Sequence, residues 1–397
     1  MNNSDYNLMA AQPAVVRVVN NILDHALLNS ITDIHLEPDD HNLLISYRQY
    51  GELSEPAIIP RDLAAGVFAH LKNLAGINTE SKVEKTISGS FKTKRLGQNT
   101  LFKASLLPVK QGEKFIIQVL PIKHKLFNLH ELGLNDENLF TIQRYLDKKT
   151  GIILIAGPDN SGTTATAYSL LSQLNLPNLN ICTLEDPIEH NFKHINQVAI
   201  NRRKGLGFEA GWNVLKNQDA DIIYLGNLDP SISSSDLAAI GTGKLIIADI
   251  TTNDSVSALA EFLNMQENKN LTAESLGLII HQRLAKQICP YCKTEHILTK
   301  SDLRRLQEKF DLDDTEQINS FTFYKGSGCA KCNHTGYLGQ IAVFEVIEID
   351  DELTESLIKH GLNYQTKKIL EEKTSISEDA FNKALKGLIS IEELIRI

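Results

Sequence analysis

The sequence predicts an α/β protein of two or three domains, one of which has a mostly parallel sheet and a phosphate-binding loop. Three observations predict this class. The chain has 397 residues, which is more than one ordinary core organises. In its middle, apolar runs of strand length alternate with helix-compatible sequence, a pattern typical of parallel sheets with helices on both faces. A loop bounded by glycines, residues 157–162, directly follows one of these runs.

Residues 1–122 predict a small α/β domain. Apolar side chains recur at helical spacing in residues 13–30, which predicts an amphipathic helix. Residues 32–38 and 43–48 alternate apolar and polar side chains and predict two half-buried strands. A second helix is predicted over residues 63–74, and more short strands over residues 91–120. We expect residues 123–135 to link this domain to the next.

Residues 136–397 predict the larger domain. A helix is expected over residues 136–149, and the continuous apolar run at residues 151–156 indicates a central strand that is buried on both faces. After the loop, a helix is predicted over residues 163–174. Three further apolar runs predict parallel strands, at residues 179–184, 221–225 and 244–250. The carboxy-terminal segment, residues 351–397, is expected to be helical.

Composition and charge narrow the function classes. The chain has 40 Lys and Arg and 49 Asp and Glu, which gives a net charge of −9. This balance argues against sequence-independent binding to nucleic acid, but it does not exclude a local basic patch. The amino-terminal residues show no secretory signal, and no apolar run approaches the roughly 18 residues of a membrane helix. We therefore expect a soluble, cytoplasmic protein.

The candidate nucleotide site is the loop that begins at Gly157 and its helix start, with Gly157, Pro158, Ser161, Gly162, Thr163 and Thr164 as binding residues. Glycines let backbone N–H groups turn toward a phosphate, and the helix N-terminus adds positive potential. Thr164 stands where a magnesium-binding hydroxyl belongs. Thr163 stands where lysine should reach the phosphates, and a short, uncharged side chain cannot do so. The alternative is an ordinary Gly/Pro/Asn turn.

The order of motifs resembles the ATPases that drive type II secretion and type IV pilus assembly. The loop and its threonine-rich helix start are similar to those of this family. Residues 184–189 are similar to its aspartate box, and residues 218–223 resemble the entry to its Walker B strand. Residues 32–38 and 281–284 match two further motifs, so that the resemblance covers residues 13–355.

The resemblance implies a PAS-like N-terminal domain and a RecA-like P-loop domain, in a subunit of a hexameric ring made of like chains or shared with a paralogue. It implies platform proteins of a pilus or secretion machine in the inner membrane as partners, and no nucleic acid. Larger members of the family have an extra N-terminal module that docks onto this platform. We expect the chain to lack this module, which puts docking by that route in doubt.

The chain departs from the family pattern where the chemistry should be. Asn227 replaces the expected general base, and Asp229 replaces an arginine. Lys244 and Thr251 replace two histidines of the histidine box. Losing these groups together with the loop lysine should leave little hydrolysis. The leading hypothesis is therefore a pseudo-ATPase; the alternative is an active motor with substituted residues, in which Lys244 takes over from the missing lysine.

Two acidic residues of the aspartate box, Glu185 and Asp186, are retained. They could still bind a magnesium ion. The sequence therefore leaves open whether ATP and Mg²⁺ bind weakly or not at all.

Four cysteines form two Cys-x-x-Cys pairs, Cys289 with Cys292 and Cys329 with Cys332. Four thiolates in paired knuckles predict a closed, structural Zn²⁺ site in the segment 289–339. A redox-active pair is the alternative. The polar excursion between the pairs, residues 293–328, is expected to lack a core of its own and to depend on the metal. The fifth cysteine, Cys182, lies in an apolar run and is predicted to be a buried core residue.

Overall fold

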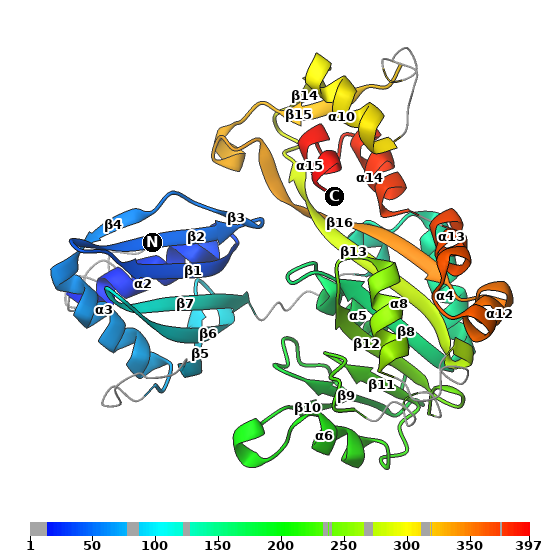
Figure 1. Ribbon diagram of the computed structural model, residues 1–397. Helices are drawn as coiled ribbons and strands as arrows, with labels where there is room; N and C mark the ends of the chain where they lie inside the picture. Colours follow the sequence, from blue (N-terminus) through cyan, green and yellow to red (C-terminus); the bar gives the residue numbers. More distant parts are fainter. Residues whose placement is uncertain are drawn as a thin grey trace. The chain divides into compact units, whose positions relative to one another are not determined.

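The computed structural model describes residues 14–77, 87–121, 128–232, 237, 240–265, 273–310, 318, 320–373 and 375–397. The chain divides into two compact units, Met1–His124 and Lys125–Ile397, which are described separately (Figure 1). The predicted linker 123–135 lies only partly within the described residues, and its role stays a prediction. No helix in the described part of the chain has the length and apolarity needed to cross a membrane.

The N-terminal unit is an antiparallel sheet with two helices. The helices are α2 (Ala14–Leu28) and α3 (Arg61–Leu74). The strands are β1 (Ile31–Pro38), β2 (Asn42–Gln49), β3 (Glu52–Leu53), β4 (Ala57–Pro60), β5 (Ile87–Arg95), β6 (Gln98–Val109) and β7 (Gly112–Pro121), in the order β3-β2-β1-β7-β6-β5, with β4 beside β2. From Ile34 to Pro38 every other residue of β1 is apolar, so Ile34 and Leu36 reach the core that both helices cover.

The C-terminal unit is built on a second, mostly parallel sheet with the order β10-β9-β11-β12-β8-β13-β16. Its strands are β8 (Gly151–Gly157), β9 (Ile181–Glu185), β10 (Asn196–Ala199), β11 (Ile222–Leu225), β12 (Leu245–Thr251), β13 (Leu276–Ile288) and β16 (Tyr337–Glu348). Only β16, at the edge of this sheet, runs antiparallel to its neighbour. The predicted α/β class with a parallel sheet is therefore confirmed.

Helices cover both faces of the second sheet because β8 is apolar throughout. Ile152 and Leu154 face one core and Ile153 and Ile155 the other. The first core contacts α6 (Phe208–Leu215), α8 (Ser255–Asn264), α12 (Asp351–His360) and α13 (Tyr364–Lys373). The second contacts α4 (Asp136–Lys148), α5 (Thr163–Leu174) and the short helix η1 (Leu129–Leu132). A further short helix, η2 (Arg202–Lys204), follows β10.

The excursion between the cysteine pairs contains β14 (Lys293–His296), α10 (Lys300–Phe310), β15 (Phe323–Gly326) and the short helix η3 (Ala330–Cys332). Its apolar side chains join a core that is shared with the C-terminal helices, so the predicted metal is not its only anchor. Leu306 and Phe323 pack with Ala380 and Ile391, which belong to α14 (Ile376–Leu385) and α15 (Ile391–Arg396). The apolar partners lie some 70 residues away in sequence, so local periodicity could not reveal them.

Candidate functional site

The loop between β8 and α5 has the backbone of a phosphate loop. Asn160 and Gly162 have positive φ angles of 62° and 87°, and the Ser161 N–H donates to the Pro158 carbonyl at 3.1 Å. At Gly157 a Cβ would lie 2.4 Å from Ser161 Oγ and 2.6 Å from the Gln282 carbonyl oxygen, so a side chain does not fit. As at any helix start, the first N–H groups of α5 lack intrahelical acceptors and point to the loop.

Gln282 of β13 holds this loop in shape. Its side-chain Nε2 donates to the Ser161 carbonyl at 2.8 Å, while its Oε1 accepts the Thr166 hydroxyl at 2.6 Å. Gln282 is buried, so both hydrogen bonds are shielded from water. Gln282 belongs to the motif at residues 281–284, but the motif alone does not indicate this role.

The predicted binding residues Gly157, Pro158, Ser161, Gly162, Thr163 and Thr164 thus lie together at one strand-to-helix turn. Thr163 and Thr164 are half-buried at the first turn of α5. That these residues bind nucleotide stays a prediction.

Asn227 and Thr251, two positions that were predicted to be degenerate, lie at the same edge of the sheet as the loop. Thr251 is the register partner of Gly157, and the Thr252 N–H donates to the Gly157 carbonyl at 3.1 Å. Asn227 follows β11, where the next residue, Leu228, donates its N–H to the Asp249 carbonyl at 2.7 Å. Asn227 and Thr251 are both exposed. Carboxyl ends of parallel strands form the usual ligand site of such sheets.

Both carboxylate oxygens of Glu185, at the end of β9, already accept hydrogen bonds. Its Oε2 accepts the Tyr168 hydroxyl, and its Oε1 accepts the Thr183 hydroxyl and, at 3.1 Å, Gln197 Nε2. The side chain is buried, so Glu185 would have to give up these donors to contact a metal. The next residue, Asp186, is exposed.

A second buried carboxyl group lies beside the loop at Asp249, which was not among the predicted site residues. Asp249 is 6% exposed, in the middle of the apolar strand β12. Its Oδ2 accepts the Tyr224 hydroxyl at 3.0 Å, and its Oδ1 has no hydrogen-bond partner. Burial raises the pKa of Asp249 well above its ordinary value. The feature of the sequence that could have identified Asp249 is a charged residue within an apolar run of strand length.

Lys244 lies at the opposite end of the sheet from the loop. It directly precedes β12, whose first residue pairs with Gly151 and whose last pairs with Gly157. Thr251 lies seven residues further along the chain, roughly 23 Å at the rise of an extended strand. Its ammonium group is 3.9 Å from Asp219. Lys244 therefore cannot replace the loop lysine within its own chain.

His281 of β13 is the register partner of Ala156, next to the loop. It is buried, and neither ring nitrogen has a hydrogen-bond partner. Burial, with the positive charge of Arg283, lowers the pKa of His281 to about 4. The imidazole is thus neutral at physiological pH.

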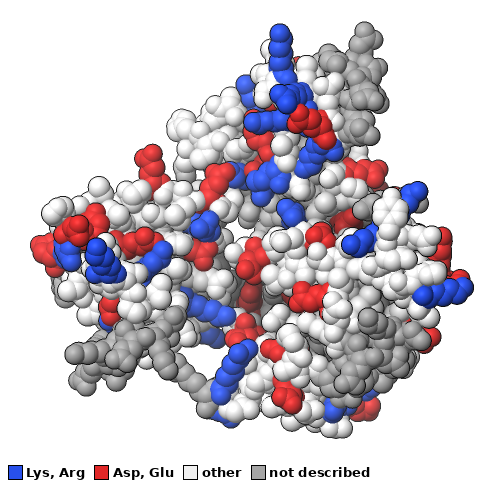
Figure 2. Space-filling view, in the orientation of Figure 1, with Lys and Arg blue, Asp and Glu red and all other residues white. Residues whose placement is uncertain are grey.

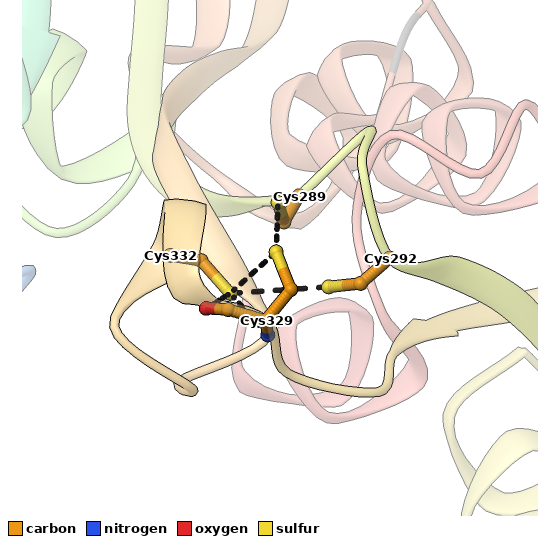
Figure 3. A group of neighbouring side chains, drawn as sticks. All are labelled: Cys289, Cys292, Cys329 and Cys332. Carbon is orange, nitrogen blue, oxygen red and sulfur yellow. Dashed lines mark hydrogen bonds between the residues drawn. The ribbon is translucent and has the colours of Figure 1, made fainter.

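The four predicted zinc ligands converge in the C-terminal unit (Figure 3). Their sulfur atoms all lie within 4.8 Å of one another, with separations of 3.9 Å for Cys289–Cys329, 3.8 Å for Cys292–Cys332 and 3.8 Å for Cys329–Cys332. Four sulfurs about 2.3 Å from a tetrahedral zinc ion lie about 3.8 Å apart.

Backbone groups also suit a thiolate centre. The N–H groups of Cys329 and Gly336 donate to Cys332 Sγ at 3.2 and 3.3 Å. The cysteine cluster therefore fits a structural zinc site. Cys182 is buried in β9, as predicted.

Two other surface features stand outside these sites. A cavity of about 780 Å³ in the N-terminal unit is lined by α2 and the β2–β4 strands, including the ring pair His25 and Tyr47. In Figure 2, Lys and Arg side chains gather at the top of the view, over the excursion. In the excursion, Lys293, Lys300, Arg304 and Arg305 are exposed, and the net charge left such a local basic patch open.

Comparisons with known proteins relate nearly the whole chain to one family. Residues 9–396 match the family described as "Type II/IV secretion system protein". The type IV pilus assembly ATPase PilB of Myxococcus xanthus is 32% identical over 402 residues, covering 99% of this chain and 69% of that protein. The type II secretion system ATPase E of Vibrio cholerae is 30% identical over 386 residues, covering 96% of this chain and 75% of that protein.

Solved structures show a similar fold at lower identity. The Legionella pneumophila ATPase DotB has a TM-score of 0.67 at 16% identity, covering 97% of both chains. The pilus retraction motor PilT with bound ADP has a TM-score of 0.60 at 19% identity, covering 95% of this chain and 96% of that chain. Both support a RecA-like assignment for the parallel-sheet unit.

Proposed function

Since the chain belongs to the type II/IV secretion system protein family, we propose that it is a pseudo-ATPase subunit of a pilus or secretion assembly motor. The observation that carries this proposal is the combination at one sheet edge: Thr163 at the lysine position, Asn227 at the base position and Thr251 beside the loop. The loop retains its shape while the groups that stabilise and transfer a phosphoryl group are replaced.

The magnitudes favour loss of turnover. A single charge-stabilising donor in a transfer site contributes roughly 10²–10³ in rate, and a trans arginine roughly 10³–10⁵. Thr163 offers a hydroxyl in place of an ammonium, and Asn227 cannot accept a proton from water. Even with strong non-additivity among these groups, little hydrolysis remains.

The alternative, an active motor with substituted residues, needs a cation near the phosphates. Its candidate, Lys244, lies at the far end of β12. A neighbouring subunit could supply the cation only in an assembly, so the alternative predicts turnover that rises steeply with protein concentration.

For partners, we propose a hexameric ring of like chains or one shared with a competent paralogue, which contacts platform proteins of the inner membrane from the cytoplasm. The family membership supports this assignment. Light scattering across a concentration series tests the ring, and a strictly monomeric protein with and without Mg-ATP would contradict it.

For the metal, we propose a structural Zn²⁺ held by Cys289, Cys292, Cys329 and Cys332. Zinc would tie the excursion to the end of β13, and it would supply no chemistry to the phosphate loop.

The phosphate-release assay of the purified chain tests the pseudo-ATPase proposal: the rate should stay at the level of the protein-free blank.

A further inference from the structure

Asp249 is a buried acid beside the phosphate loop, and the described residues offer it no cation. It lies on the face of β12 that α5 covers, next to Tyr224 of β11. No ion pair joins it to a lysine, arginine or histidine in the described part of the chain. Its Oδ1 is buried without a hydrogen-bond partner, a costly arrangement for an ionised carboxylate.

Other groups that face Asp249 are also acidic or neutral. Tyr224 on β11 and Thr163 on α5 supply hydroxyl groups, while Glu185 at the end of β9 and Glu189 beyond it add negative charge. On the other neighbouring strand, β8, its register partner Ile155 is apolar. No cation therefore packs against Asp249, and only the Tyr224 and Thr163 hydroxyls partly stabilise its ionised form, whereas the protonated acid is neutral and has an O–H to donate.

We propose that Asp249 is a specificity-determining residue of the loop: a polyphosphate anion binds there only while the Asp249 carboxyl is protonated. An anion in the loop and an ionised Asp249 would repel each other in a site of low dielectric, so the two states exclude each other. Binding of the anion is then linked to uptake of one proton by Asp249. This inference deepens the proposed function, because it takes the loop as an anion site that has lost turnover.

Calorimetric titration with Mg-ATP between pH 6 and pH 8.5, in two buffers of different ionisation enthalpy, tests the proposal. For the wild type we expect the Kd to weaken by at least about tenfold over this range, with proton uptake on binding. Asp249→Asn should bind with little pH dependence, take up no proton and bind at least about tenfold tighter than wild type at pH 8.5.

Two variants serve as controls. Asp219→Asn removes one exposed carboxyl at the opposite end of the sheet and should follow the wild type. Tyr224→Phe removes the hydroxyl that stabilises the ionised form, so its pH profile should shift to higher pH, which a purely structural role would not produce.

Each outcome bears on one proposal. An Asp249→Asn variant with wild-type pH dependence and proton uptake would overturn the role of Asp249. So would the absence of binding by both proteins at every pH, which leaves the loss of turnover standing. Hydrolysis by the wild type would instead contradict the pseudo-ATPase proposal, whether or not Asp249→Asn changes the binding profile.

Discussion

The side chain of Gln282 donates to the main-chain carbonyl of Ser161 at 2.8 Å and thereby ties the phosphate loop to strand β13. The same amide accepts the Thr166 hydroxyl on α5. One buried side chain thus bridges the loop and its helix, and this bridge does not depend on the missing lysine.

Gln282→Ala should destabilise the C-terminal unit by about 1–3 kcal/mol, because it leaves the Ser161 carbonyl and the Thr166 hydroxyl without buried partners. Denaturant unfolding measures the change. The matched control is Gln287→Ala on the same strand, where the side chain is half-exposed and the expected effect is within about 0.5 kcal/mol. Equal losses for the two variants would contradict the bridging role.

Asp249→Asn should stabilise the protein, and the gain should be larger at pH 8 than at pH 5. Burial raises the pKa of Asp249 in the folded state. The folded protein therefore holds this proton more tightly than the unfolded chain, and the stability it confers is lost as the pH rises through the folded-state pKa. Unfolding midpoints at the two pH values test this. A stabilisation by Asp249→Asn that is larger at pH 5 than at pH 8 would contradict this prediction.

His281→Gln should reduce the loss of stability on acidification. The pKa of His281 is lowered to about 4 in the folded protein, whereas the unfolded histidine titrates near 6.5. The unfolded state thus gains the proton first, and stability falls as the pH drops from about 6.5 toward 4, by a few kcal/mol at most. Thermal unfolding between pH 7 and pH 5 gives the slope, which should be shallower in the variant. An unchanged slope would mean that groups other than His281 cause the loss of stability at low pH.

Cys329→Ser should reduce bound zinc from about one ion per chain to near zero, because a closed tetrahedral site needs all four sulfurs. Hydrogen exchange should rise in β14, α10 and β15 and stay unchanged in β1–β7, which belong to a separate unit. Cys182→Ser is the control, since Cys182 lies outside the cluster and its loss should leave the metal content intact. Metal analysis with full zinc in Cys329→Ser would refute the four-sulfur site.

Thr163→Lys should tighten Mg-ATP binding, because the ammonium group restores a positive charge at the loop. Hydrolysis should nonetheless stay at background, since Asn227 still supplies no base. Adding Asn227→Glu should raise turnover above either single variant.

Lys244→Ala should change neither the affinity for Mg-ATP nor the rate of hydrolysis, because Lys244 lies at the far end of β12. A loss of binding in Lys244→Ala would reopen the active-motor alternative.

Much of the fold could be predicted because its elements show strong local patterns. The all-apolar run of β8 and the stripe of α2 predict a buried strand and an amphipathic helix within a residue or two of the observed bounds. The long strands β13 and β16 have no such pattern along their full length. Their antiparallel pairing joins segments some 60 residues apart, so short-range periodicity does not reveal it.

The site was predictable where chemistry depends on spacing. Paired cysteines predict their own convergence, and the glycines of residues 157–162 predict the loop. The roles of Gln282, Tyr224 and Asp249 arise only when neighbouring strands bring them to the loop. The expectation that Glu185 could order magnesium did not foresee that Tyr168, Thr183 and Gln197 donate to it, because these donors come from three different elements.

The central claim is that the loop keeps its shape but has lost phosphoryl transfer. The most direct measurement is a Mg-ATP binding titration paired with a phosphate-release assay on the same purified sample, alongside Thr164→Ala. We expect weak binding and a phosphate-release rate that is indistinguishable from that of Thr164→Ala. Clear hydrolysis by the wild type that Thr164→Ala abolishes would contradict the account.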